Sequence, residues 1–155
     1  MGRSKYNVSD NTAERTYNGI VFDSRLEMRY YADVVLPLME TGEILNFELQ
    51  KKYILQPKFH NGLKIVQPIT YTADFYIEYA DGHNEVIDTK GCPDGVALLK
   101  RKMFWYHFPD IRYRWITYIK KFGGWIEYEE ALKCRKEAKK ARIAAQENEQ
   151  KECPF

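Results

Sequence analysis

Two carboxylates and a lysine are spaced in this chain as the hydrolysis of a phosphodiester bond would require. Asp74 lies in one alternating run of residues, and Asp88 and Lys90 lie two residues apart in the next. Carboxylate oxygens are hard ligands that bind Mg²⁺, and one or two of them with a substrate phosphate usually suffice. Such a metal would polarise the phosphate and lower the pKa of a bound water. A lysine beside it would hold that water or stabilise the charge that develops on the phosphate.

A β-hairpin is the element that would bring these three residues together. Apolar and polar residues alternate from Ala73 to Tyr79, which is the period of a half-buried strand. Asp81-Gly82 is a turn signal, since glycine tolerates positive φ. Folding the chain back there pairs position 74 with about 89 or 90. The register depends on the turn length, and a slip of one residue would turn Asp88 and Lys90 away from Asp74.

Two further groups are candidates for the metal shell. The main-chain carbonyl of Thr89 would add an oxygen ligand, because hard cations also bind main-chain oxygens. Glu27, on a predicted helix, would join the metal directly or through water. Ser24 and Glu27 also have the spacing of a capping box, in which the glutamate bonds the backbone N–H of the capping residue. Both roles of Glu27 remain open on the pattern alone.

Composition indicates one folded domain with a tail. The chain has 155 residues, of which 45% are hydrophobic and 15% aromatic. No signal peptide is evident, and no apolar run approaches the roughly 20 residues that span a bilayer. Three widely spaced cysteines, Cys92, Cys134 and Cys153, fit neither a zinc site nor a disulfide framework. We therefore expect a cytoplasmic protein.

The positive charge is concentrated after the hairpin. Residues 101–155 carry 13 Lys and Arg against 8 Asp and Glu, whereas residues 1–50 carry 5 against 8. Lys100, Arg101 and Lys102 would contact DNA phosphates, which would make binding salt-dependent. A solvated helix face explains these three residues equally well.

The predicted elements follow from periodicity and from breaker residues. A helix from Ser24 to about Glu40 contains Pro37, which would kink or shorten it. The other predicted elements are strands at 44–48, 51–59 and 62–66, hairpin strands at 69–79 and 84–90, a helix at 96–107 with Val96, Leu99 and Met103 on one face, a strand at 112–119 and a charged helix at 127–148.

This order of elements predicts an α/β or α+β class with a mixed sheet. The predicted parts are a polar segment (1–18), a core (19–125) and a charged helix with a tail (126–155). Glu85 is expected to be solvated near the turn. Glu48 and Gln50 would either approach the site from the neighbouring strand or lie on a solvated strand edge, and the pattern favours the solvated edge.

Several blocks of residues resemble a known superfamily. Asp74 followed by Asp88-Thr89-Lys90 resembles the D…(D/E)-x-K core of the PD-(D/E)xK nucleases. Further blocks resemble a phage family of that superfamily formerly known only as a domain of unknown function: 22–27, 47–50, 53–57, 71–75 and 99–102. The likeness covers roughly residues 18–119. It departs in Asp88, where many members have Glu, and in Ala73, where many have Pro.

The resemblance implies a fold and an activity. The fold would be a restriction-endonuclease-like core, a central mixed four-stranded sheet flanked by helices. The activity would be Mg²⁺- or Mn²⁺-dependent DNA cleavage, with Glu27, Asp74, Asp88 and Lys90 as catalytic residues. Relatives in the superfamily include junction-resolving endonucleases and transposon end-cutting nucleases.

We therefore expect a phage-encoded endodeoxyribonuclease that acts on DNA in recombination, repair or processing, branched DNA included, in the bacterial cytoplasm. Cutting both strands would need two active sites, which favours a homodimer. The alternative is a non-catalytic DNA-binding or assembly module that keeps the fold.

Overall fold

The computed structural model describes residues 11–151, with side chains as far as residue 146. The first ten residues of the predicted polar segment and Cys153 in the tail lie outside this range. The chain divides into two compact units, residues 1–115 and 116–155. No helix in the described part of the chain is long and apolar enough to cross a membrane.

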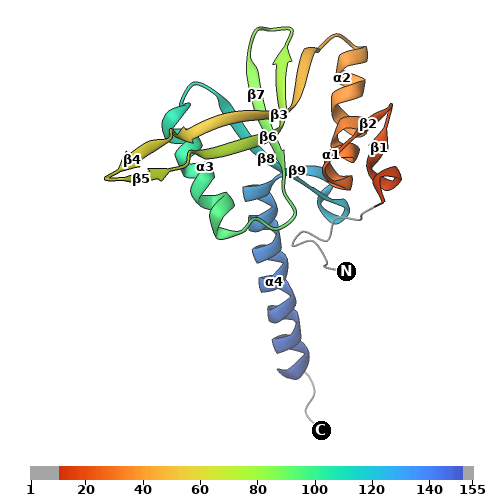
Figure 1. Cartoon of the computed structure of the whole chain (residues 1–155). Coiled ribbons are helices and arrows are strands. Elements are labelled where there is room, and N and C mark those ends of the chain that lie inside the picture. Colours follow the sequence, from red (N-terminus) through yellow and green to blue (C-terminus); the bar gives the residue numbers. More distant parts are fainter. Residues whose placement is uncertain (1–10, 152–155) are drawn as a thin grey trace. The chain divides into compact units, whose positions relative to one another are not determined.

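The first unit contains a β-sheet (Figure 1), and strands of this sheet carry candidate site residues. Its adjacent strands are, in order, β3 (Ile44–Gln56), β6 (Ile69–Tyr79), β7 (Asn84–Thr89) and β8 (Arg112–Ile119). The first three are mutually antiparallel. Helix α3 (Gly95–His107) joins β7 to its neighbour β8, which is the crossover connection that parallel strands need. The sheet is therefore mixed, and the predicted α/β class is confirmed.

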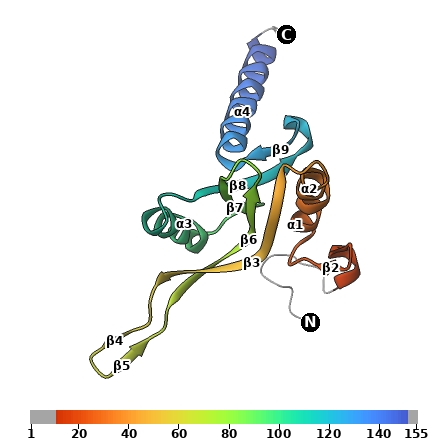
Figure 2. The same ribbon diagram turned by 90° about the horizontal axis from the view of Figure 1, so that it is seen from above.

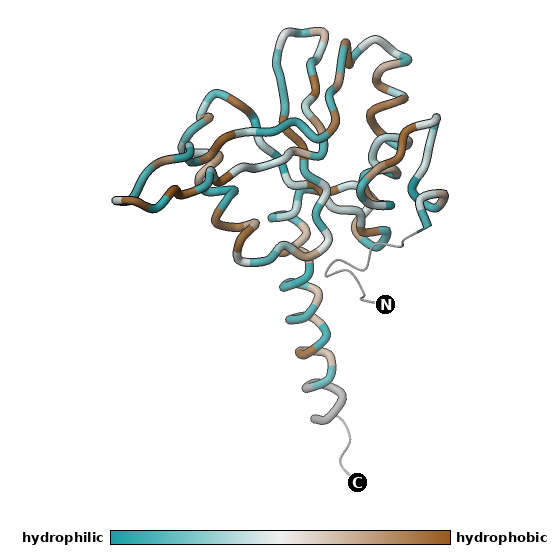
Figure 3. The backbone as a smooth tube through the Cα atoms, in the orientation of Figure 1, coloured by the Kyte–Doolittle hydropathy of each residue, from teal (hydrophilic) through white to brown (hydrophobic). Residues whose placement is uncertain are grey.

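Strand β8 continues into the second unit and pairs there with β9 (Gly124–Glu127). The sheet thus has five strands where four were expected. Helix α4 (Tyr128–Lys151) follows directly, close to the predicted range 127–148. It is rich in Lys, Glu and Ala, and its tube in Figure 3 is mostly hydrophilic.

Two prolines divide the long β3–β6 ribbon from a smaller hairpin. The two strands predicted at 44–48 and 51–59 form the single strand β3, which ends immediately before Pro57. Strand β6 begins immediately after Pro68. Proline has no N–H to donate to a ladder, so the pairing stops at these positions. Between them, β4 (Phe59–Asn61) and β5 (Lys64–Val66) form a separate two-stranded sheet, and we call residues 57–68 the arm hairpin. Figure 2 shows it extending away from the main sheet of its unit.

The predicted helix from Ser24 to Glu40 is present, with a wide turn ahead of its proline. Helix α1 (Arg25–Tyr30) passes through a π-helical turn (Tyr31–Val35) into α2 (Leu36–Glu40). The N–H of Leu36 reaches the carbonyl of Tyr31, five residues back. Pro37 offers no N–H and its ring would clash with the carbonyl four residues earlier, so the extra residue in this turn lets the helix continue past it.

Before α1, the described part of the N-terminal segment also has local structure. A 3₁₀ turn (Thr12–Arg15) leads into a small hairpin of β1 (Thr16–Tyr17) and β2 (Ile20–Val21).

Aromatic side chains form the core between the helices and the sheet. Tyr30 of α1 lies 5.3 Å from Phe75 of β6, centroid to centroid. Phe104 of α3 lies 4.6 Å from Tyr113 of β8. Phe75 and Phe104 are fully buried. Helices α1 and α3 therefore each pack on the sheet through tyrosine and phenylalanine rings.

Helix α3 buries a face other than the apolar stripe that periodicity suggests. Val96 and Leu99 are both more than half exposed. Phe104 and Arg101 are the buried side chains of this helix. The Arg101 guanidinium lies 4.4 Å from the Trp105 ring and 4.2 Å from the Trp115 ring, so flat apolar surfaces replace aliphatic contacts on this face.

Candidate active site

Asp74 and Asp88 face each other across two neighbouring strands. Phe75 pairs with Ile87 and Tyr76 with Val86, and this register continued by one residue places Asp74 opposite Asp88. The partner of position 74 is thus 88 rather than 89 or 90. The two carboxylates project from directly opposed positions, where Cβ atoms lie about 5 Å apart.

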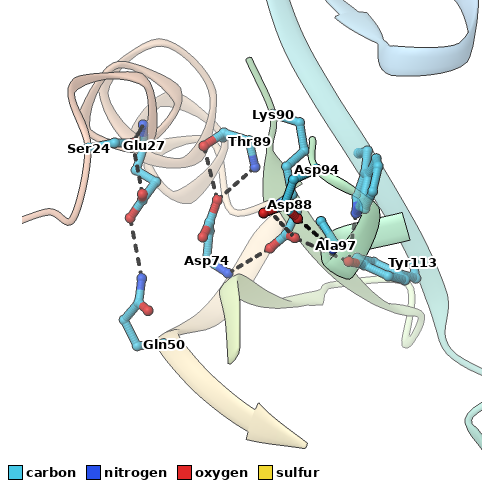
Figure 4. Close-up of polar contacts among 11 residues, drawn as sticks. Ser24, Glu27, Gln50, Asp74, Asp88, Thr89, Lys90, Asp94, Ala97 and Tyr113 are labelled. Carbon is cyan, nitrogen blue, oxygen red and sulfur yellow. Dashed lines mark hydrogen bonds and ion pairs between the residues drawn. The ribbon is translucent and has the colours of Figure 1, made fainter. Parts of the chain in front are cut away.

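Hydrogen bonds join the two strands around these carboxylates (Figure 4). The backbone N–H of Asp74 donates to Asp88 Oδ1 (3.2 Å). Asp74 Oδ2 accepts from the backbone N–H of Thr89 (2.7 Å) and from the Thr89 hydroxyl (3.0 Å). Thr89, predicted as a carbonyl ligand, therefore also fixes the rotamer of Asp74 through its two donors.

Lys90 forms the closest ion pair of the site. Its Nζ lies 2.7 Å from Asp88 Oδ2, and the same oxygen accepts from the Tyr113 hydroxyl (3.1 Å). The Tyr113 oxygen in turn accepts from Trp115 Nε1 (2.6 Å). Asp88 is only 1% exposed, so β8 supplies this carboxylate with a buried chain of donors that sequence reasoning did not identify.

Glu27 forms a helix cap and also lies near the aspartates. The Ser24 hydroxyl accepts from the backbone N–H of Glu27 (3.1 Å), as an N-cap does. The Glu27 carboxylate accepts from the Ser24 hydroxyl (2.8 Å) and from the N–H of Asp23 (3.3 Å), one residue before the position that the capping box predicts. It is nevertheless only 6% exposed, and it is close enough to Asp88 for the charge of Asp88 to add to the rise of the Glu27 pKa. The cap therefore holds Glu27 in place beside the aspartates.

Gln50 takes the less favoured of the two positions expected from the sequence. Its side-chain amide donates to Glu27 Oε2 (3.3 Å), so the side chain approaches the site, although β3 is the edge strand of the sheet. Leu49 pairs with Phe75 and Lys51 with Ala73, which places Gln50 beside Asp74 across the ribbon. Its φ is +54°, a conformation that non-glycine residues seldom adopt and that often marks functional sites. Figure 4 shows Glu27 and Gln50 on one side of Asp74, with Asp88 and Lys90 on the other.

Negative charge exceeds positive charge among these buried groups. Burial raises the pKa of Glu27 to about 7, with the neighbouring charges of Asp23 and Asp88 adding to the rise and the Ser24 hydrogen bond opposing it. Burial also raises the pKa of Asp74 well above its usual range, and the charges of Asp88 and Glu27 raise it further. Such displaced pKa values are typical of functional sites.

Lys90 is held as a cation. Burial alone would lower its pKa, but the charges of Asp88 and Asp74 outweigh that effect and the pKa is raised. A lysine suits a site of this kind as a compact point charge. Its lone positive charge does not balance three carboxylates.

The donor set fits a hard divalent cation. Asp74 and Asp88 offer carboxylate oxygens at opposed positions, and a bound cation would relieve the repulsion that raises the Asp74 pKa. In the described part of the chain, no group of three or more His, Cys, Asp or Glu side chains is already arranged to hold a metal ion.

The three basic residues of α3 have different surroundings. Lys100 lines a pocket of about 310 Å³ together with Asp88 and Lys90. Lys102 is exposed. Arg101 is 8% exposed between two indole rings, so its guanidinium is a core group in this structure and does not present itself to DNA. Lys100 is the best placed of the three to meet a phosphate near the aspartates.

A second buried carboxylate lies on β7, three residues before Asp88. Glu85 is 1% exposed, although a solvated position was predicted. Arg112 and Arg114 each place a guanidinium nitrogen 3.0 Å from it, and the Tyr79 hydroxyl donates to it at 3.2 Å. The prediction failed because the pairing partners come from β8, about 28 residues further along the chain.

The chain was compared with known proteins. A family model described as a protein of unknown function, DUF1064, matches residues 3–124. The chain belongs to this family. The DUF1064 match includes every candidate site residue described above and ends before α4. The comparison with curated proteins gives no match.

Proposed function

We propose that this DUF1064 protein is a metal-dependent DNA endonuclease of the PD-(D/E)xK type, with a restriction-endonuclease-like core. The observation that carries the proposal is the opposed pair Asp74 and Asp88 with Lys90 at 2.7 Å from the second carboxylate. The arrangement of acidic, acidic and basic side chains on one hairpin supports the resemblance noted in the sequence. The surplus of buried carboxylate adds a reason for a cation to bind there.

Each residue has a distinct role in this proposal. Asp74 and Asp88 would hold Mg²⁺ or Mn²⁺, with the Thr89 carbonyl as a further ligand and Glu27 behind them. A bound cation of this class lowers the pKa of water and polarises a phosphate oxygen. Lys90, kept protonated by its neighbours, would orient the attacking water and neutralise charge that develops on the phosphate.

In this proposal Tyr113 and Gln50 position other residues of the site and do not contact the substrate. The Tyr113 hydroxyl fixes the Asp88 oxygen that also meets Lys90, and the Gln50 amide fixes Glu27. Lys100, in the adjoining pocket, would contact a neighbouring phosphate of the substrate.

A cleavage panel tests the proposal. Purified protein would be incubated with a four-way junction, a fork, a duplex and a single strand, with Mg²⁺, with Mn²⁺ and with EDTA. Cleavage that requires metal and is lost in Lys90→Ala supports the proposal. Absence of cleavage on all four DNAs, together with no heat of Mg²⁺ or Mn²⁺ binding in calorimetry, would refute it. Salt-dependent DNA binding in that case would favour the non-catalytic alternative.

The proposal extends to assembly and setting. If the enzyme cuts both strands of a duplex, two copies of the site are needed, as in a homodimer. Light scattering with and without DNA measures the number of copies in the assembly. A phage origin and action in the bacterial cytoplasm, during recombination, repair or processing, belong to the same proposal.

A further inference from the structure

The arm hairpin (residues 57–68) exposes apolar side chains that its own unit does not cover. Leu63, at the tip, is 104% exposed, and Phe59 and Ile65 are 45% and 46% exposed. Figure 3 shows hydrophobic and hydrophilic residues following each other along it. An isolated two-stranded hairpin is only marginally stable in water, and apolar groups exposed on a protruding element mark a contact surface.

The tip of the arm has a fixed geometry. Asn61 pairs with Lys64, which leaves a loop of two residues, Gly62 and Leu63. Gly62 has φ +61°, as the first central residue of a type II′ turn does. This tight turn places the Leu63 side chain at the end of the ribbon.

The charge of the arm indicates an anionic partner. Between Glu48 and Asp74 the sequence has no Asp or Glu but has four lysines and one histidine. Lys51 is engaged by Glu48 (3.1 Å). Lys58 and Lys64 are exposed on the arm. Two copies of this arm would repel each other, whereas a polyanion would attract it.

The arm is continuous with the strands of the candidate site. Strand β3, which leads into the arm, carries Gln50, and β6, which leaves it, carries Asp74. At about 3.3 Å per residue, Pro57 lies roughly 20 Å and Leu63 at most about 40 Å from Gln50 along the ribbon. These lengths correspond to about 6 to 12 base pairs of duplex.

We propose that the arm hairpin binds the DNA substrate beside the site of cleavage. Lys58 and Lys64 contact phosphates, and Leu63 inserts at a base step whose stacking is already interrupted. The geometry supports this, because a two-stranded ribbon fits a DNA groove and apolar side chains serve as wedges between base steps. Branched DNA, with unstacked steps at its centre, is then the preferred substrate class. This inference rests on the proposed function and gives it a substrate.

The test measures binding in EDTA, so that cleavage does not interfere. Fluorescence anisotropy compares a four-way junction with a duplex of the same length for three variants. Lys58→Gln with Lys64→Gln weakens binding to both DNAs roughly tenfold or more at 0.1 M salt and lowers the salt slope by about 2. Leu63→Ala weakens junction binding and leaves duplex binding unchanged. The control, Lys133→Gln with Lys136→Gln on α4, removes the same charge and keeps the wild-type affinity.

Other outcomes overturn the inference. If the arm variants bind both DNAs like the wild type while metal-dependent cleavage persists, the arm has no part in DNA binding. The proposed function would then stand without this inference. A wild-type protein that binds neither DNA would refute both this inference and the proposed function. Arm variants that keep DNA affinity but convert a dimer to a monomer in light scattering would identify a second copy as the occupant.

Discussion

Strand β7 carries two buried carboxylates with opposite electrostatic surroundings. Asp88 faces Asp74 across the hairpin, its charge adds to the raised pKa values of Asp74 and Glu27, and it has one cation, Lys90, at 2.7 Å. Glu85, three residues earlier, has two arginines at 3.0 Å and a tyrosine hydroxyl at 3.2 Å. Negative charge is in excess at the first position and positive charge at the second. Both residues are 1% exposed, so burial does not distinguish them.

The contrast separates a compensated ion cluster at Glu85 from an uncompensated one at Asp88. A buried charge is tolerated when partners compensate it, as the arginines do for Glu85. An uncompensated cluster costs free energy, and the raised pKa values of Asp74 and Glu27 express that cost. The proposed cation site would relieve this cost, because carboxylate oxygens suit a hard cation.

The largest expected difference is in cleavage. Asp88→Asn should lower metal-dependent cleavage by at least about 1,000-fold, because one of the two proposed metal ligands loses its charge. Glu85→Gln makes the same change of charge on the same strand and should keep cleavage within about tenfold. Both rates would be measured on the best DNA of the panel, with folding checked by circular dichroism. Equal losses in the two variants would mean that the two clusters do not differ in function.

The free energy of unfolding should respond in the reverse order, with the larger loss for the change at Glu85 and none for the change at Asp74. Glu85→Gln should lower the free energy of unfolding by about 1–3 kcal/mol, because Arg114, which is 27% exposed, loses its carboxylate. Asp74→Asn should leave it unchanged or raise it, because a repelled charge is removed. Urea denaturation in EDTA measures both. A large loss of stability in Asp74→Asn alone would contradict the assignment of surplus charge to the active site.

A smaller effect is expected from pH. The pKa of Glu27 rises from 4.5 to about 7 on folding, so between these values the folded protein binds more protons than the unfolded chain. The contribution of Glu27 to stability is therefore present in full below pH 4.5 and is lost as pH rises to about 7, by at most about 1.4 kcal/mol per pH unit. Urea denaturation of metal-free protein between pH 5 and 8 should show this decline, and Glu27→Gln should flatten it. Glu85→Gln, as control, should keep the slope.

The smallest effect concerns the backbone at Gln50. Glycine adopts positive φ without strain, so Gln50→Gly should change the free energy of unfolding by no more than about 1 kcal/mol, with relief of strain offsetting the flexibility of glycine. Cleavage should nevertheless fall several-fold, because Glu27 loses an amide donor. Gln50→Ala, which keeps the strain and also lacks the amide, is the comparison for stability. Unchanged cleavage in both variants would make the contact incidental.

Local signals in the sequence predicted much of the scaffold. The Asp81-Gly82 turn and the alternation before it predict β6 with its observed limits and β7 one residue too long, and the strand predicted at 112–119 coincides with β8. Ser24 marks the start of α1. The hairpin register was wrong by one or two positions, because loop length is not set by the turn residues alone.

Features that depend on contacts distant in sequence could not be predicted. The partners of Glu85 and Asp88 lie on β8, and only the packed sheet shows that one carboxylate meets arginines and the other a tyrosine. Arg101 was predicted to be a surface cation, because the sequence does not reveal that the indole of Trp115 packs against its guanidinium. For Gln50 the sequence favoured the wrong one of two positions, since positive φ in a strand has no pattern when the residue is not glycine. The catalytic assignment itself stays a prediction.

The π-helical turn at Tyr31–Val35 has a consequence for how this helix tolerates change in length. The wide turn takes up one residue more than a regular turn, so the residues after it face as they would in an α-helix one residue shorter. Deleting one residue from the turn, together with Pro37→Ala, would give an uninterrupted α-helix in which Glu27 keeps its cap and Leu36–Glu40 keeps its orientation. The turn therefore uncouples the two ends of the helix, and natural variation in length is expected after Tyr30 rather than before it.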